Sequence, residues 1–235
     1  MSSESPADAL PASASVLVVC TGNVCRSPAA QLLLESRLAA AGQTGVHVIS
    51  AGTRARPGDP VSGPMATLLR ADGVDPDAFS SRLLADLDID AADLVITMSR
   101  DHRAAVVRAV PSAVRRTFTL LELALLLSTA PRMDGTPDTA ASRWRELRAV
   151  ATSQRGRHAG RLDDLDVPDP IGRGARVYGN VYGTIARAVD AVCRVAIPGT
   201  PGFERDVLSP AGPVTGSTSS RRPPRHSPHP GPQRR

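Results

Sequence analysis

The fold is decided by one stretch near the N-terminus, Ser15-Val16-Leu17-Val18-Val19-Cys20-Thr21-Gly22-Asn23-Val24-Cys25-Arg26-Ser27-Pro28. Its apolar run at 16–19 predicts a buried strand, and Ser27-Pro28 opens an apolar run at 29–41 that is typical of a helix. A loop between a strand and a helix N-terminus, with Gly22 at its bend, presents converging backbone N–H groups. Such a concavity binds phosphate-like oxyanions. The stretch therefore predicts a strand, an anion-binding loop and a helix.

Two side chains of this loop supply reactive groups. Cys20 lies at the floor of the loop, where the N–H dipoles and Arg26 can hold it as a thiolate. The planar guanidinium of Arg26 can also bind two oxygens of a trapped oxyanion. A nucleophile beneath a bound phosphoryl group is typical of a cysteine phosphatase. The alternative is a buried strand-end cysteine followed by ordinary helix-start residues, and it accounts less well for the complete string.

Three segments of the chain occur in a telling order: the loop at 20–28, Ser50-Ala51-Gly52-Thr53, and Asp169-Pro170. Together they resemble the low-molecular-weight protein tyrosine phosphatase family of the bacterial type, over roughly residues 15–197. The resemblance implies a single α/β domain with a four-stranded parallel, doubly wound sheet and helices on both faces. It also implies a metal-independent hydrolase that needs no cofactor and acts on phosphorylated proteins.

The resemblance gives the site residues defined roles. Cys20 attacks phosphorus to form a cysteinyl-phosphate, Arg26 binds the oxygens, and Asp169 protonates the leaving group and then activates water. Ser27 is expected to donate a hydrogen bond to the Cys20 sulfur, and Asn23 to hold the loop in a strained turn. The other expected members of the phosphate-binding loop are Thr21, Gly22, Val24 and Cys25.

The acid is expected on a stiff loop, Val167-Pro168-Asp169-Pro170, in which two prolines limit the movement of the backbone. From composition alone Asp169 could equally be a turn residue before the last helix. The resemblance favours the acid role. The neighbouring acidic residues are interpreted as a solvated stretch: Asp163, Asp164 and Asp166.

Cysteine usage bears on redox chemistry. Cys25 follows Cys20 by five residues, and the resemblance implies a reversible disulfide that shelters the nucleophile from over-oxidation. Packing beneath the loop is compatible with this role, and Cys193 is expected to pack in the last helix. Between Cys25 and Cys193 the sequence lacks the cysteine pair of thioredoxin-coupled arsenate reductases. A thiol-dependent arsenate reductase of the same fold, or a phosphate or phosphoprotein sensor with weak catalysis, stays an alternative.

The substrate preference is read from three positions. Phosphotyrosine-directed members of the family place aromatic rings where this chain has Arg56 and Ile171, so these two residues are expected to line the cleft. Arg56 could stack on a ring or attract an acidic substrate. Members that resemble protein arginine phosphatases carry Thr where this chain has Val24. Phosphotyrosine is therefore the favoured target.

Strand-like and helix-like segments alternate along the chain, which predicts a parallel sheet whose ligands bind beyond the carboxyl ends of its strands. The segment at 128–167 is longer than the compact family pattern requires. Within it, an extra helix is predicted at 142–154 around Trp144, with Ser142 as its cap. It would either flank the acid loop or decorate the surface. Strands are predicted at 16–19, 46–50, 94–98 and 116–120, and helices at 28–41, 61–72, 101–110, 121–127 and 176–197.

The remaining features concern the ends of the chain. Residues 1–14 and 198–235 are rich in small residues and proline and are expected to be disordered tails. All 28 basic residues are arginine, and the six from Arg205 onward outnumber Glu204 and Asp206, so most of the +5 net charge lies in this tail. Charge therefore gives no indication of nucleic acid. With no secretory signal, no membrane-spanning run and an exposed thiol, a cytoplasmic location is expected. Oligomeric state is left open.

Overall fold

The structure is a computed structural model that describes residues 13–130, 139–161 and 165–197. The two predicted tails lie outside these residues, apart from Ser13 and Ala14, as do Asp163 and Asp164. Within the described residues, no helix is long and apolar enough to cross a membrane.

A four-stranded parallel sheet forms the centre of the molecule, with the strand order β2-β1-β3-β4. Central strand β1 is buried on both faces, because Val16 and Val18 pack into one core and Leu17 and Val19 into the other. This explains its continuous apolar sequence. The predicted parallel α/β fold is confirmed. The strands are β1 (Ala14–Cys20), β2 (Val46–Gly52), β3 (Leu94–Thr97) and β4 (Thr117–Thr119).

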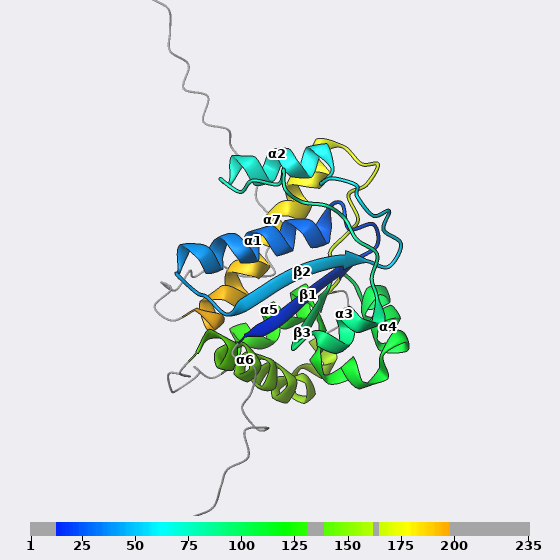
Figure 1. Cartoon of the computed structure of the whole chain (residues 1–235). Helices are drawn as coiled ribbons and strands as arrows, with labels where there is room; N and C mark the ends of the chain where they lie inside the picture. The colour runs from blue at the N-terminus through cyan, green and yellow to red at the C-terminus, as the bar shows by residue number, and fades with distance from the viewer. Residues whose placement is uncertain (1–12, 131–138, 162–164, 198–235) are drawn as a thin grey trace, which may run out of the picture.

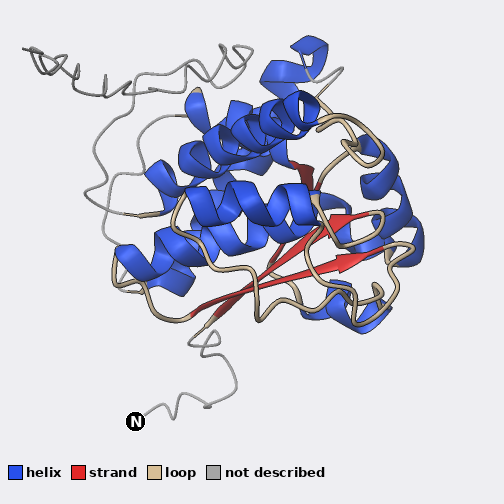
Figure 2. Ribbon diagram, turned by 90° about the horizontal axis from the view of Figure 1, so that it is seen from above, coloured by secondary structure: helices blue, strands red, loops and turns tan. Residues whose placement is uncertain are grey.

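Helices cover both faces of the sheet (Figure 1; Figure 2 gives the view from above). The larger core lies under α1 (Arg26–Ala40), α2 (Gly63–Ala71), α5 (Leu120–Ser128) and α7 (Ala175–Ala196). The smaller core lies under α3 (Asp86–Ala91), α4 (Arg100–Ala109) and the 3₁₀ helix η2 (Pro111–Arg116). The sequence did not indicate α3 or η2, because six residues are too few to display a helical period.

An extra helix, α6 (Ala140–Gln154), lies across the amino ends of the strands (Figure 1) and leads into the 3₁₀ helix η3 (Arg155–Arg161). Arg145 of α6 donates a 2.7 Å hydrogen bond to the Ser13 carbonyl, just before β1. It also pairs at 3.1 Å with Asp93, just before β3. Trp144 is only 1% exposed and belongs to the larger core. The helix therefore neither flanks the acid loop nor decorates the surface, but closes the core at the end of the sheet opposite Cys20.

The predicted start of α6 was wrong. The helix begins at Ala140, and its cap is Thr139, whose hydroxyl accepts a hydrogen bond of 3.1 Å from the Ser142 backbone N–H. A threonine side chain satisfies a free N–H group of the first turn as well as a serine does. Ser142 is therefore inside the first turn.

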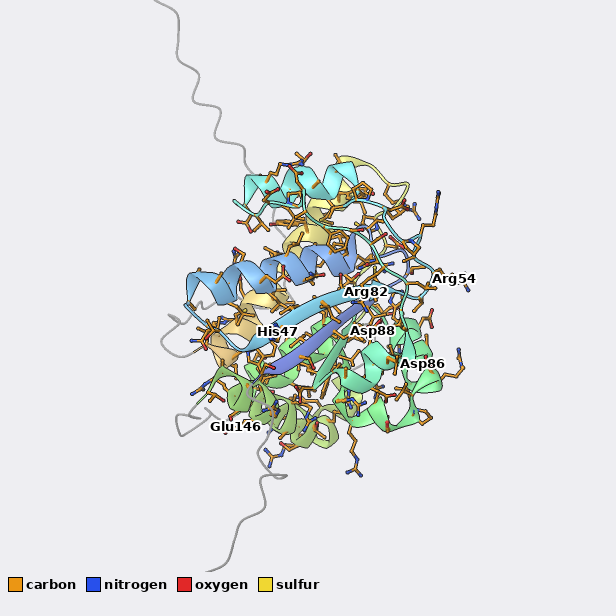
Figure 3. The ribbon with its side chains drawn as sticks, viewed as in Figure 1. His47, Arg54, Arg82, Asp86, Asp88 and Glu146 are labelled. Atoms are coloured by element: carbon orange, nitrogen blue, oxygen red, sulfur yellow. The ribbon has the colours of Figure 1, made fainter. Side chains whose placement is uncertain are left out.

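We expect Trp144→Ala to lower the free energy of unfolding by about 3 to 5 kcal/mol, because a large buried ring leaves a cavity. Glu146→Ala is the matched control on the same helix, since Glu146 lies on α6 at this end of the sheet (Figure 3) and its side chain forms no hydrogen bond with the described residues. It should change the same quantity by no more than about 0.5 kcal/mol. Urea unfolding measures both. A loss of unfolding free energy in Trp144→Ala no larger than that in Glu146→Ala would contradict the role of Trp144 in closing the core.

Candidate active site

The loop from Cys20 to Arg26 joins β1 to α1 at the carboxyl edge of the sheet. Asn23 adopts a φ of +52°, in the left-handed region that asparagine tolerates better than most residues. This turn brings the Asn23 backbone N–H to 3.3 Å from the Cys20 sulfur, to which it donates. Cys20 itself is 2% exposed. The loop therefore directs the Asn23 backbone N–H dipole at the sulfur.

The Asn23 side chain orders the hydroxyl beside that sulfur. Its Oδ1 accepts a 2.8 Å hydrogen bond from the Arg82 backbone N–H, which fixes the orientation of the amide. The Nδ2 group therefore donates to Ser50 Oγ at 2.7 Å and to Ser27 Oγ at 2.9 Å. Because Ser27 Oγ accepts from Asn23, its own hydroxyl proton is directed at Cys20 Sγ, 2.9 Å away.

The end of β2 supports the loop from behind. A Cβ atom on Gly52 would lie 2.5 Å from the Thr21 carbonyl and 2.9 Å from the Asn23 nitrogen, so a side chain does not fit here. The next two residues continue the contact, because Thr53 N–H donates to the Cys20 carbonyl and Arg54 N–H to that of Thr21. The Ser-Ala-Gly-Thr segment is thus a backbone support for the loop.

Arg26 joins the phosphate loop to the predicted acid loop. Its guanidinium is buried, with a side-chain exposure of 7%. Nη1 donates to the Val167 carbonyl at 3.1 Å, and Nη2 to Asp169 Oδ2 at 2.6 Å. Asp169 is 47% exposed at the mouth of the loop. The three residues predicted to carry the chemistry, Cys20, Arg26 and Asp169, therefore belong to one site.

Each of the residues from Leu165 to Val167, just before Asp169, forms a hydrogen bond to the carboxyl edge of the sheet. Asp166 was interpreted as part of a solvated stretch, but its Oδ1 accepts a 2.8 Å hydrogen bond from the backbone N–H of Arg100 at the start of α4. Asp166 is thus partly solvated, with a side-chain exposure of 39%, and is also anchored by this bond. Three consecutive contacts hold the segment at the carboxyl edge of the sheet: Thr119 Oγ1 to Leu165 O, Arg100 N to Asp166 Oδ1, and Val167 N to Met98 O.

His102 is a residue of this site that sequence reasoning missed. Its Nε2 lies 2.8 Å from Thr21 Oγ1, and its Nδ1 lies 2.8 Å from Ser99 Oγ. Burial, with the positive charge of Arg26 beside it, lowers the pKa of His102 to about 4. The ring is therefore neutral at neutral pH and bridges the phosphate loop to the start of α4. Its position just beyond the carboxyl end of β3 was the available signal.

The remaining cysteines are buried. Burial raises the pKa of Cys25 to about 12 and that of Cys193 to about 12, so both thiols stay protonated at neutral pH. Cys193 packs in α7 as expected. Disulfide exchange between Cys25 and Cys20 stays a prediction.

The two predicted cleft residues are both exposed. Arg56 follows the β2 support, beyond Arg54, which extends outward in Figure 3. Ile171 is 51% exposed and follows the acid, and its N–H donates to Asp169 Oδ1. Arg82 points instead to Asp88 of α3, with which it forms an ion pair (Figure 3).

The lowered pKa of His102 predicts a loss of stability in acid. On acidification the unfolded chain, with a pKa near 6.5, takes up the proton first, so this stability is complete above that pH and is lost as the pH falls toward 4. Between about pH 7 and about pH 5 the loss should be about 2 kcal/mol. Urea unfolding at both pH values measures this loss. In His102→Gln the free energy of unfolding should fall by about 2 kcal/mol less over the same pH interval. An unchanged pH dependence in the variant would contradict the assignment.

Known proteins resemble this chain in part of its sequence and in its fold. A family model described as low molecular weight phosphotyrosine protein phosphatase matches residues 15–124. The protein-arginine-phosphatase of Geobacillus stearothermophilus is 39% identical over 105 residues, which cover 45% of this chain and 68% of the relative. The probable low molecular weight protein-tyrosine-phosphatase EpsP of Ralstonia solanacearum is 34% identical over 108 residues, which cover 46% and 71%.

Two solved structures align with 77% of this chain. The YwlE arginine phosphatase from Geobacillus stearothermophilus is covered over 91% of its length, with a TM-score of 0.56 and 28% identity. The low molecular weight protein tyrosine phosphatase from T. tengcongensis is covered over 99%, with a TM-score of 0.57 and 26% identity. The two sequence relatives, each more than 30% identical over more than two thirds of its length, show together with the family model that the chain belongs to the low-molecular-weight phosphotyrosine protein phosphatase family.

Proposed function

We propose that this protein hydrolyses phosphotyrosine in protein substrates through a cysteinyl-phosphate intermediate. The observation that carries the proposal is the 2.6 Å contact between Arg26 and Asp169 beside the loop that holds Cys20. It supports a nucleophile, an oxyanion-binding cation and an acid acting on one bound group. Membership of the phosphatase family supports the same reaction class.

In the first step the Cys20 thiolate attacks phosphorus and the bond from phosphorus to the tyrosine oxygen breaks. Asp169 gives its proton to that oxygen. The loop N–H groups and Arg26 meet the charge on the three equatorial oxygens. The bonds from Nη1 to the Val167 carbonyl and from Nη2 to Asp169 fix the guanidinium beside the loop.

In the second step water attacks the phosphorus of the intermediate and Asp169, now a carboxylate, accepts its proton. The bond from sulfur to phosphorus breaks and the electron pair returns to Cys20. The Ser27 hydroxyl, 2.9 Å from the sulfur, stabilises the departing thiolate. The products are tyrosine and inorganic phosphate, and the enzyme is restored.

Phosphotyrosine is favoured over phosphoarginine by the loop residue Val24. The relatives include phosphatases of both kinds, so overall similarity does not decide between them. The exposed Arg54 and Arg56 beside the mouth add a preference for substrates with acidic residues near the phosphorylated one. The substrate class we propose is therefore an acidic phosphotyrosine segment.

Hydrolysis of two aryl phosphates with EDTA present tests the catalytic roles. Asp169→Asn should lower kcat about 100-fold or more for phenyl phosphate, whose leaving group needs a proton, and far less for p-nitrophenyl phosphate. Cys20→Ser should abolish turnover of both. Equal losses on the two substrates would remove Asp169 from the acid role. Inactivity of the folded wild type would favour the arsenate reductase or the phosphate sensor.

Paired peptides carrying phosphotyrosine or phosphoarginine test the substrate. The wild type should give the higher kcat/KM on phosphotyrosine. Val24→Thr should shift the ratio of the two values about tenfold toward phosphoarginine, a change of about 1.4 kcal/mol. Val24→Ala is the matched control, because it removes the valine without adding a hydroxyl. A wild type that prefers phosphoarginine would overturn the tyrosine assignment.

A further inference from the structure

A hollow of about 400 Å³ lies between η2 and α6. Because η2 directly precedes β4, and α6 crosses the amino ends of β1 and β3, the hollow lies at the edge of the sheet opposite Cys20. It is therefore separate from the catalytic cleft. Its polar lining consists of three arginines and three hydroxyl residues: Arg115, Arg116, Arg148, Ser112, Thr152 and Ser153.

Arg116 is the one arginine of the lining that forms an ion pair with a described residue, Asp90. Among the described residues, none that lines the hollow is acidic. Arg116 donates to the carbonyls of Ile89 and Ser112, and Arg148 donates to the carbonyl of Asp93. Carbonyl groups orient a guanidinium but leave its full charge in place. The carboxylate that approaches Arg116, that of Asp90, is 3.8 Å away and is itself 59% exposed.

Two groups of the lining arginines have no hydrogen-bond partner among the described residues. The Arg116 Nε–H is buried and has no hydrogen-bond partner in the described part of the chain. A buried donor without a partner is costly, and a bound acceptor would satisfy it. Arg115 is exposed, and its guanidinium forms no recorded bond within the described ranges. Both features fit an anion with several oxygens, which matches the fork geometry of arginine.

We infer that this hollow binds a small phosphorylated organic molecule, of the size of a nucleotide or a sugar phosphate. Its volume falls within the range of about 300 to 1,000 Å³ that is usual for small-molecule sites. Ala149 and the aliphatic stems of the arginines provide an apolar wall for the organic part of the ligand. A hollow of this size suits a compact ligand, whereas a protein partner would need a broad surface.

The inference gives the long segment after α5 a role. Arg148 and Ser153 come from α6, which lies in the segment expected from the sequence to be longer than the compact family pattern. Arg115 and Arg116 come from η2, which belongs to the domain itself. The site therefore exists because α6 packs beside η2, and it does not depend on the proposed phosphatase reaction.

Calorimetric titration of the full chain tests the site with three probes: ADP, glucose 6-phosphate and inorganic phosphate. At least one organic phosphate should bind saturably, and Arg115→Ala and Arg148→Ala should each weaken it about tenfold. Arg115→Ala removes no recorded contact, so it is expected to fold normally. Arg108→Ala, an exposed arginine on α4 outside the lining, is the matched control and should leave the affinity unchanged.

Because the phosphate loop also binds phosphate, Arg26→Ala separates the two sites. Binding that survives Arg26→Ala and is weakened by Arg115→Ala belongs to the hollow. The reverse pattern would place the probe in the phosphate loop and overturn the inference. The inference would also be overturned if neither ADP nor glucose 6-phosphate bound, or if an acidic peptide such as polyglutamate bound in their place.

Discussion

The hydrogen bonds of the Arg26 guanidinium are the contacts on which the rest of the site depends. A buried guanidinium must have its N–H groups satisfied, because an unpaired buried charge costs several kcal/mol. Arg26 meets this demand with the Val167 carbonyl and the Asp169 carboxylate, whose sequence positions are 141 and 143 residues away. The start of α1 and the loop before α7 are therefore held together by one side chain. The acid is brought to the nucleophile by the same bonds that stabilise the arginine.

The phosphate loop itself is held from outside. Its Asn23 turn has an unusual backbone conformation, which is stabilised by bonds to Ser27, Ser50 and the Arg82 backbone. The missing side chain at Gly52 lets β2 approach the loop closely. A loop fixed in this way presents its N–H groups without rearrangement when charge develops, which is the source of electrostatic catalysis. His102, neutral and buried, adds a contact to Thr21 from the other side of the sheet.

The two ends of the sheet have different roles. The carboxyl edge collects the loops that follow β1, β2 and β3, together with the acid loop, and carries the chemistry. At the amino edge α6 buries Trp144 and places Arg148 beside η2. The carboxyl edge carries Arg26, which pairs with Asp169, and the amino edge carries the three arginines of the hollow that we infer to bind an anion. Between the two edges, the residues of β1 are buried, apart from the half-buried Ser15.

The sequence by itself determined the sheet, most helices and the members of the loop. These signals are local: a parallel central strand is apolar at every position because both its faces are buried, and the loop residues are consecutive. The acid Asp169 was reached through family resemblance, because nothing local separates it from a turn aspartate. Only the tertiary structure decided the anchoring role of Asp166, the bridge from His102 to Thr21, and the place of α6. Each of these depends on partners far apart in the chain, 66 residues for Asp166 and 81 for His102, and such distant contacts leave no periodic trace in the sequence.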